Sequence, residues 1–471
     1  MKQYLNKILN QITTELELTA SQEGVIKKAY NAVADWLTQN DSLLKNYEIS
    51  IFPQGSVKLG TVVKPIKQDD YDVDLVCLFN ENTNHLTAEQ VKMFVGKRLK
   101  ENQRYKTMLA KEGKRCWTLQ YSDSLNFHMD ILPAIATKNS NVIYATHKEN
   151  NLYKFISTNP HDYAEWFKQR MNTNAAVLDR NNIERVPNYQ QKSVLQKTIQ
   201  ILKRHRDVMF KDDDANAPIS IIITTLVAKL YLGETSIIDF LENVVKKICS
   251  TIENRNGTYW VTNPVNEKEN FADKWVKEPI KKVKFYEWAE RISNDYQRLL
   301  TVKSKVELLN CLYDMFDQKV VDLANNHLGG FDKIAPNLPE NSVISYKVKE
   351  ALNAPHRQTP PWKLPTWNTV EIVTTADDKM IHSGEPLNKG MHLKFRAKYF
   401  SNKKYYIKWQ VTNTGTEAKN CLRGDFYNSD NGDPNIRTES TSYTGIHYVQ
   451  CFVISNGLCI AKSREFIVNV L

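Results

Sequence analysis

Two short motifs near the N-terminus constrain this chain most. Gln54-Gly55-Ser56 predicts a turn, and Asp72-Val73-Asp74 then opens a run that stays apolar as far as Phe79. Side chains of a strand alternate between its two faces, so Asp72 and Asp74 project to the same side. Two carboxylates held on one face repel each other, and a cation between them relieves this repulsion. The alternative is a surface strand with two solvated acids, because this spacing is common by itself.

A third acid is predicted to complete the pair. Residues 125–133 alternate, with apolar side chains on one face and Asn126, His128 and Asp130 on the other, and Pro133 is expected to end the strand. A lone acid in a strand suited to burial is costly unless it is paired or bound to a metal. By itself Asp130 would be interpreted as a surface acid at a strand end. With the pair upstream, we expect it to join Asp72 and Asp74.

This set of side chains indicates a reaction class. Mg²⁺ prefers oxygen ligands and is typically bound by one or two carboxylates together with substrate phosphates. Three carboxylates can hold two Mg²⁺ ions, with Mn²⁺ as an alternative, and Gly55 and Ser56 can offer N–H groups and a hydroxyl to phosphates. Such a site works by positioning and charge stabilisation. The expected chemistry is attack of a hydroxyl on the α-phosphate of a nucleotide.

Composition sets the broader class. The 471 residues predict two or three domains, and 41% hydrophobic with 25% charged residues excludes a largely disordered chain. A net charge of +10 favours contact with polyanions, although one nucleotide pocket could account for part of it. Seven scattered cysteines without metal-ligand spacing favour a reducing cytoplasm and argue against structural zinc. No apolar leader and no window of 18 apolar residues is found, so a cytoplasmic protein without membrane contact is expected.

The order of patterns predicts four parts. Residues 1–175 should form an α+β core that starts with two helices, the second capped by Thr19 and Gln22. Residues 176–345 should form a helical lobe with a hairpin turn at Asn256-Gly257. Residues 346–368, rich in Pro and Trp, should form a rigid linker in which Trp362 and Trp367 are packing anchors. Residues 369–471 show regular short strands, which predict a β-sandwich.

Two side chains of the helical lobe have competing interpretations. Lys203 lies four residues before Asp207, so an intrahelical ion pair is the simplest role for it. Ser220 follows Pro218 at a predicted helix start, where it could cap the helix or hold a phosphate.

Taken together, these motifs resemble the polymerase-β-like nucleotidyltransferase superfamily. Within it, the chain is similar to the bacterial relatives of cyclic GMP–AMP synthase, which make cyclic oligonucleotide signals in antiphage defence. The supporting stretches are Gln54–Ser56, Gly60-Thr61, Asp72–Asp74, His128–Asp130, Leu202–Asp207, Pro218–Leu226 and Asn263–Trp275. Asn413–Gly415, Leu422–Gly424 and Ser463–Phe466 are similar to the C-terminal sensor domain of some of these synthases.

The resemblance implies a fold and an activity. The fold would be a polymerase-β-like core with a helical lobe and a C-terminal all-β sandwich. The enzyme would join NTPs into a short cyclic or linear oligonucleotide second messenger, which a downstream effector reads. Alternatives are an enzyme that extends RNA ends and a nucleotide-sensing regulator without turnover. Without a zinc insertion of the kind that animal relatives use, direct activation by duplex DNA is not expected.

The resemblance also assigns residues. Asp72, Asp74 and Asp130 would be catalytic metal ligands. Gln54, Gly55 and Ser56 would bind the triphosphate. Lys203 and Ser220 match positions that contact donor phosphates, beside the simpler roles given above. His128 is a candidate for a supporting or base-contacting role.

Overall fold

The computed structural model of the chain describes residues 1–39, 41–66, 71–83, 85–121, 127–138, 140–171, 183–187, 191–331, 351–365, 370–401, 404–430 and 432–471. The chain divides into two compact units. The N-terminal unit comprises residues 1–208, 214–300 and 315–329, and the C-terminal unit comprises residues 209–213, 301–314 and 330–471. The three domain boundaries predicted above, like Leu125, Asn126 and Trp367, lie outside the described residues.

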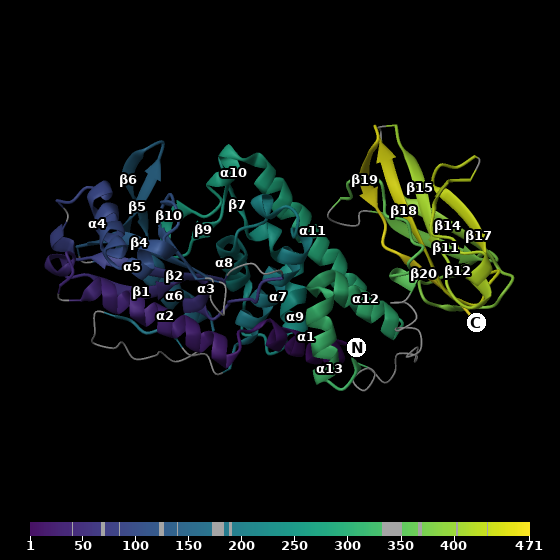
Figure 1. Cartoon of the computed structure of the whole chain (residues 1–471), viewed down its shortest axis with the longest axis horizontal. Helices are drawn as coiled ribbons and strands as arrows, with labels where there is room; N and C mark the ends of the chain where they lie inside the picture. Colours follow the sequence, from purple (N-terminus) through teal and green to yellow (C-terminus); the bar gives the residue numbers. More distant parts are fainter. Residues whose placement is uncertain are drawn as a thin grey trace. The chain divides into compact units, whose positions relative to one another are not determined.

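The N-terminal unit is built on a mixed sheet with the strand order β1-β2-β4-β5-β6, and β3 pairs with the first half of β4 (Figure 1). β2 and β4 run parallel, while β1 pairs antiparallel with β2. The strands are β1 (Ser50–Gln54), β2 (Tyr71–Phe79), β3 (Trp117–Tyr121), β4 (Phe127–Thr137), β5 (Ser140–Glu149) and β6 (Leu152–Thr158).

One face of this sheet carries the main apolar core of the unit. Helices α2 (Ala20–Thr38) and α4 (Ala88–Glu101) pack on it, and the predicted capping box of Thr19 and Gln22 is present at the start of α2. Alternate residues of β2 point into this core, namely Val73, Leu75, Cys77 and Phe79. The pleat of the strand therefore leaves Asp72 and Asp74 on the opposite face.

Pro133 does not end its strand, contrary to the sequence-based expectation. β4 continues to Thr137, and Pro133 pairs with Cys77 of β2. On the other side of β4 the partner changes at this point, since β3 pairs as far as Ile131 and β5 pairs from Ala134. The missing N–H of Pro133 thus falls between two ladders, where proline is tolerated inside a sheet.

Helices dominate the rest of the N-terminal unit. They are α1 (Lys2–Leu16), α3 (Gly55–Leu59), α5 (Gln103–Met108), α6 (Pro160–Arg170), α7 (Val194–Met209), α8 (Ser220–Leu230), α9 (Ile237–Lys247), α10 (Lys274–Lys277), α11 (Pro279–Thr301) and α13 (Gln318–His327), while α12 (Lys305–Phe316) lies mainly in the C-terminal unit. α1 packs against α9 and α13. Short strands interrupt the helices at β7 (Glu253–Arg255), β8 (Thr258–Trp260), β9 (Thr262–Asn263) and β10 (Asn266–Asn270). Asn256 and Gly257, both with positive φ, form the predicted hairpin turn.

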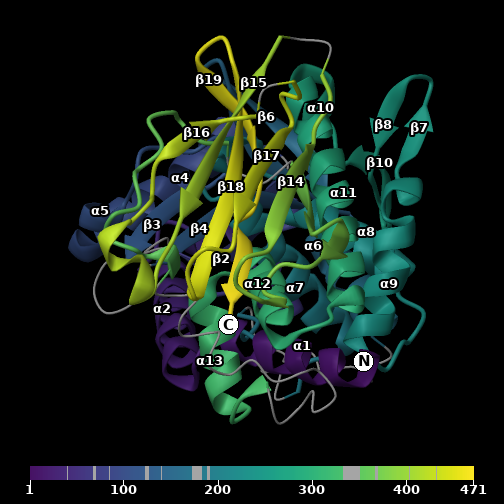
Figure 2. The same cartoon turned by 90° about the vertical axis from the view of Figure 1, so that its right-hand side faces the viewer.

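The C-terminal unit contains the predicted β-sandwich. One sheet has the order β12-β11-β14-β17, and the other has the order β13-β20-β18-β15-β16 with β19 beside β18 (Figures 1 and 2). Phe395 of the first sheet contacts Trp409 and Phe466 of the second inside the shared core. The strands are β11 (Glu371–Ala376), β12 (Lys379–Ile381), β13 (Pro386–Leu387), β14 (His392–Lys398), β15 (Tyr406–Thr412), β16 (Phe426–Asn428), β17 (Ile436–Ser440), β18 (Gly445–Ser455), β19 (Leu458–Lys462) and β20 (Phe466–Val470).

The described part of the Pro- and Trp-rich segment, residues 351–365, packs on the outer face of the second sheet. Trp362 lies against Phe426 and Phe452, which agrees with its predicted role as an anchor. Gly424 approaches this segment so closely that a Cβ there would lie 2.2 Å from the carbonyl oxygen of His356. The segment is therefore an integral layer of the C-terminal unit.

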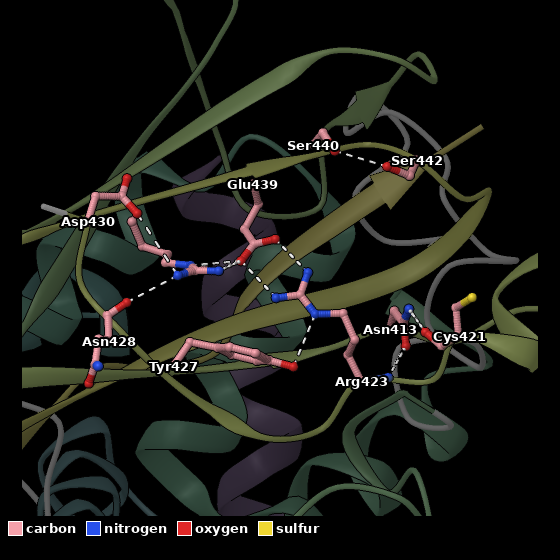
Figure 3. A network of polar contacts seen from close by, with 10 residues as sticks. Asn413, Cys421, Arg423, Tyr427, Asn428, Asp430, Glu439, Ser440 and Ser442 are labelled. Atoms are coloured by element: carbon pink, nitrogen blue, oxygen red, sulfur yellow. Dashed lines mark hydrogen bonds and ion pairs between the residues drawn. The ribbon is translucent and has the colours of Figure 1, made fainter.

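A polar cluster links the two sheets of the sandwich (Figure 3). Arg423 donates two hydrogen bonds to the carboxylate of Glu439 on β17, at 2.6 and 3.0 Å. Arg437 donates to the same carboxylate at 2.8 Å, and both guanidinium groups lie over the ring of Tyr427. Tyr427 belongs to β16, so the cluster joins edge strands of different sheets.

In the described part of the chain no helix is long and apolar enough to cross a membrane.

Candidate functional site

The acid pair lies on β2, and the third acid lies on the neighbouring parallel strand β4. In the register of these strands Asp74 is directly opposite Asp130, and Asp72 is directly opposite His128. Paired residues of neighbouring strands project to the same face. The three carboxylates therefore lie at adjacent positions on the face that α2 and α4 leave uncovered.

Asp74 has the most strongly perturbed acidity of the three. Burial raises the pKa of its carboxyl group to about 7, and repulsion from Asp72 and Asp130 acts in the same direction. The ammonium group of Lys203 opposes this shift. A carboxyl group in this state holds its proton near neutral pH, and a nearby cation would favour the ionised form.

Asp72 is reachable by water but is still desolvated by its surroundings. Its side chain is exposed at the surface of the sheet, yet burial is the main cause that raises its pKa, and Asp130 raises it further. Positive charge on His128, Lys203 and Arg206 lowers it. We interpret this carboxylate as surrounded by protein on most sides and open to a solute on one.

Asp130 is held from the strand on its other side. Thr118 of β3 is its direct partner in the β3–β4 register, and the Thr118 hydroxyl donates to Asp130 Oδ1 at 2.5 Å. A hydrogen bond of this length to a carboxylate is typical of a charge-assisted contact. β3 therefore fixes the orientation of the third acid.

The Gly-Ser turn lies directly against Asp74. Gln54 ends β1 opposite Asp74, and Gly55 begins α3. Gly55 has φ +64°, and a Cβ there would lie 2.1 Å from Asp74 Oδ2. Only glycine fits, both for its backbone conformation and for this close approach. Ser56 follows as the second residue of α3.

Lys203 reaches the same region from α7. Its ammonium group donates to the carbonyl oxygen of Thr61 at 3.0 Å and to the Thr61 hydroxyl at 3.1 Å. Burial lowers its pKa to about 7, and repulsion from Arg206 adds to this effect. The carboxylate of Asp207, considered above as its partner, accepts a hydrogen bond from Arg206 at 2.8 Å.

Ser220 is the first residue of α8 and does not cap it. The N-cap is Ile219, which makes no side-chain capping bond. The Ser220 hydroxyl accepts a hydrogen bond from Arg206 Nη1 at 3.0 Å, and the same nitrogen donates to the carbonyl oxygen of Pro218 at 2.9 Å. Arg206 thus fixes the start of α8.

Sequence reasoning did not single out Arg206. It was included only in the stretch Leu202–Asp207 that supports the resemblance, although it lowers the pKa of both Asp72 and Lys203 and binds Ser220. The available signal was its position in Lys203-Arg204-His205-Arg206, where a cationic run continues around a helix whose other face is apolar.

Asp72, Asp74 and Asp130 are the candidate ligands for a metal ion. Among the described residues, no set of three or more His, Cys, Asp or Glu side chains stands in a ready-made metal-binding arrangement. The donor chemistry nevertheless fits a hard cation, because three carboxylates lie at neighbouring register positions and the charge of Asp130 raises the pKa of both Asp72 and Asp74. These residues are therefore suited to hold a divalent ion.

Comparison with known proteins adds independent information. Residues 2–171 match the Second Messenger Oligonucleotide or Dinucleotide Synthetase domain, and residues 352–471 match the Adenylyl/Guanylyl and SMODS C-terminal sensor domain. A c-di-GMP synthase of Roseivirga ehrenbergii is 30% identical over 307 residues, which are 63% of this chain and 80% of that protein. A cyclic GMP-AMP synthase of Escherichia albertii is 23% identical over 455 residues, which are 95% of this chain and 90% of that protein.

Solved structures agree at the level of the fold. The Bradyrhizobium diazoefficiens CD-NTase CdnG in complex with GTP is similar with a TM-score of 0.56 at 18% identity, covering 69% of this chain and 99% of that chain. E. coli MS115-1 CdnC with ATP gives a TM-score of 0.51 at 13% identity, covering 67% and 98%. The fold expected from the sequence for the N-terminal unit is thereby confirmed.

Proposed function

Because the chain belongs to the bacterial cyclic GMP–AMP synthase-like nucleotidyltransferases with a C-terminal sensor domain, we propose that it joins NTPs into a short cyclic oligonucleotide. The observation that carries the proposal is the set of three carboxylates on adjacent parallel strands, in contact with a Gly-Ser turn. This arrangement suits transfer of a nucleotidyl group to a hydroxyl, since that reaction needs cations and phosphates brought together in a fixed geometry.

The acids act as the cation-binding centre in this proposal. Asp72, Asp74 and Asp130 would hold two Mg²⁺ ions, or Mn²⁺ in their place. When bound, these ions would activate the attacking hydroxyl and neutralise the charge of the leaving pyrophosphate. Thr118 keeps Asp130 oriented, and the close approach of Gly55 keeps Asp74 against the turn.

The phosphates would lie between the turn and the helical lobe. Gln54, Gly55 and Ser56 lie beside Asp74 on one side, and Lys203 and Ser220 come from helices on the other. The ammonium group of Lys203 has three donors, of which two bind Thr61, and it interacts electrostatically with Asp72 and Asp74. Negative charge from a triphosphate would favour its protonated form. Arg206 would position Ser220 for the same ligand.

The family likeness also supports a proposal for the biological setting. We assign the product to second-messenger signalling in antiphage defence, where an effector protein binds it. The C-terminal unit would be the regulatory part of the enzyme. All seven cysteines are free, which favours action in the reducing cytoplasm.

A single assay tests the activity. The protein is incubated with Mg²⁺ and labelled NTPs, in each base combination and without RNA, and the products are separated by chromatography before and after phosphatase treatment. A phosphatase-resistant dinucleotide or trinucleotide is the expected result. Product that forms only when an RNA end is added would instead show the RNA-extending activity, and binding without turnover would show a nucleotide sensor.

A further inference from the structure

The segment of residues 59–64 connects the Gly-Ser helix α3 with the stretch that leads to the acid strand β2. From Thr61 to Pro65 the backbone belongs to neither a helix nor a strand. Its carbonyl groups therefore need partners outside regular secondary structure, because an unpaired buried carbonyl costs about 1–3 kcal/mol.

One helix supplies these partners. Four side chains of α7 donate hydrogen bonds to four carbonyl oxygens of the segment, and we call them the α7 polar face. Gln196 binds Leu59 O at 2.9 Å, Lys203 binds Thr61 O at 3.0 Å, Gln200 binds Val62 O at 2.7 Å, and Arg204 binds Lys64 O. Their spacing of four, three and one residues places all four on one side of a helix.

The α7 polar face is buried, which is unusual for such side chains. The four residues are between 0 and 5% exposed. Gln and Arg are rarely buried to this extent unless hydrogen bonds compensate for the loss of water. The side chains of α7 thus supply the hydrogen-bond donors that a neighbouring strand would otherwise supply to the carbonyl groups of this segment.

Arg204 also connects the α7 polar face with the start of helix α13. Its Nη1 donates to Asp317 Oδ2 at 2.6 Å, while the other carboxylate oxygen of Asp317 caps α13 by accepting from Val320 N at 3.2 Å. Asp317 has φ +67° and ψ 154°, a conformation outside the left-handed helical region that residues other than glycine rarely adopt, so its two contacts hold a strained backbone in place. The last carbonyl of the segment is therefore tied, through one guanidinium group, to the start of α13.

We propose that Gln196, Gln200 and Arg204 are positioning residues for nucleotidyl transfer. They hold residues 59–64 in place and thereby set the Gly-Ser turn against Asp74. The inference rests on the proposed function. None of these three side chains touches the acids in the described structure; they act through the backbone, and a displacement of about 1 Å at a catalytic group can cost a hundredfold in rate.

The test removes donors while keeping the volume of the side chain. Gln200→Met and Arg204→Met each lose the hydrogen bonds to the segment, and Arg204→Lys keeps one donor. Lys197→Met is the matched control, because Lys197 also lies on α7 but binds Asn10 Oδ1 at 2.8 Å. Each variant is assayed for kcat and KM with NTPs, for thermal unfolding, and for hydrogen exchange of the Thr61 and Lys64 amides, which bind Ser56 O and Leu16 O at 2.9 Å.

For Gln200→Met we expect kcat to fall about tenfold or more with KM changed less than about threefold, and faster exchange at Thr61 and Lys64. Arg204→Lys should recover part of the activity that Arg204→Met loses, and Lys197→Met should match the wild type. Wild-type kcat and exchange in Gln200→Met would overturn the inference. If the wild type makes no product, the proposed function fails, and the exchange measurement still decides whether the α7 polar face holds the segment. If Gln200→Met does not fold, Gln196→Met replaces it under the same criteria.

Discussion

In the N-terminal sheet three carboxylates lie side by side, whereas in the C-terminal sandwich the carboxylate of Glu439 lies between two guanidinium groups (Figure 3). Both arrangements raise a pKa, but the consequences for charge are opposite, because a raised pKa disfavours a charged carboxylate and favours a charged guanidinium group. Burial and neighbouring acids raise the pKa of Asp74 to about 7, while hydrogen bonds to Glu439 raise the pKa of Arg423 and keep it charged.

This difference in charge distinguishes the candidate functional site of the N-terminal sheet from the structural cluster of the C-terminal sandwich. In the C-terminal cluster Arg423 and Arg437 face two carboxylates, Glu439 and, at 4.0 Å from Arg437, Asp430, so its charges are matched within the protein and it gains little from a further ion. The acids of β2 and β4 lack such balance, and charge brought by a ligand would supply it. Unbalanced charge that the fold itself enforces is therefore the better indicator of where chemistry takes place.

The largest expected effect is on activity. Asp74→Asn should lower kcat about a thousandfold, which corresponds to ~4 kcal/mol of transition-state stabilisation, because an amide is a much weaker cation ligand. Arg423→Met should leave basal activity within about twofold, since it removes a contact inside the sandwich. Product formation by both variants is compared at saturating NTP and Mg²⁺. Equal losses of kcat in the two variants would show that Asp74 matters no more for activity than the Arg423 contact in the sandwich.

A smaller effect is expected on the stability of the sandwich. Arg423→Met breaks two hydrogen bonds to Glu439, a carboxylate that is 11% exposed and keeps Arg437 as its partner. Because Arg423 is partly exposed, the loss should be about 2 kcal/mol in the unfolding free energy of the C-terminal unit. Denaturant unfolding measures it, with Lys398→Met as control at an exposed ion pair to Glu371. An equal effect of both variants would show that the cluster in Figure 3 contributes no more than an ordinary surface pair.

The smallest effect concerns the stability of the acid site and its dependence on pH. Asp74 has a folded-state pKa of about 7 against 3.8 for the free side chain, so the folded state binds the proton more tightly. Stability is therefore lost as pH rises from about 4 to about 7. A shift of this size corresponds to ~4 kcal/mol at most, and because Asp74 is only partly buried we expect Asp74→Asn in metal-free buffer to stabilise the protein by about 1 kcal/mol at pH 8 and by little at pH 4.5. Thermal unfolding at both values checks this, and a gain that does not depend on pH would contradict it.

Local patterns predicted much of the fold. Alternation of apolar residues gave the faces of β2 and β4, and Thr19 with Gln22 marked the start of α2, because each of these depends on neighbouring residues alone. Pro133 was misjudged because the tolerance of a proline depends on where partner strands begin and end. Asp130 could be expected near the acid pair from its strand pattern.

Residue type and strand period alone predicted the residues that we propose for the chemistry, namely Gly55, Asp72, Asp74 and Asp130. Tertiary structure decided what supports them. Lys203 binds Thr61 rather than its neighbour Asp207, and Gln196, Gln200 and Arg204 bind carbonyl groups that lie more than 130 positions away. No local pattern contains such contacts, because a buried polar side chain finds its partner only after packing has brought distant segments together.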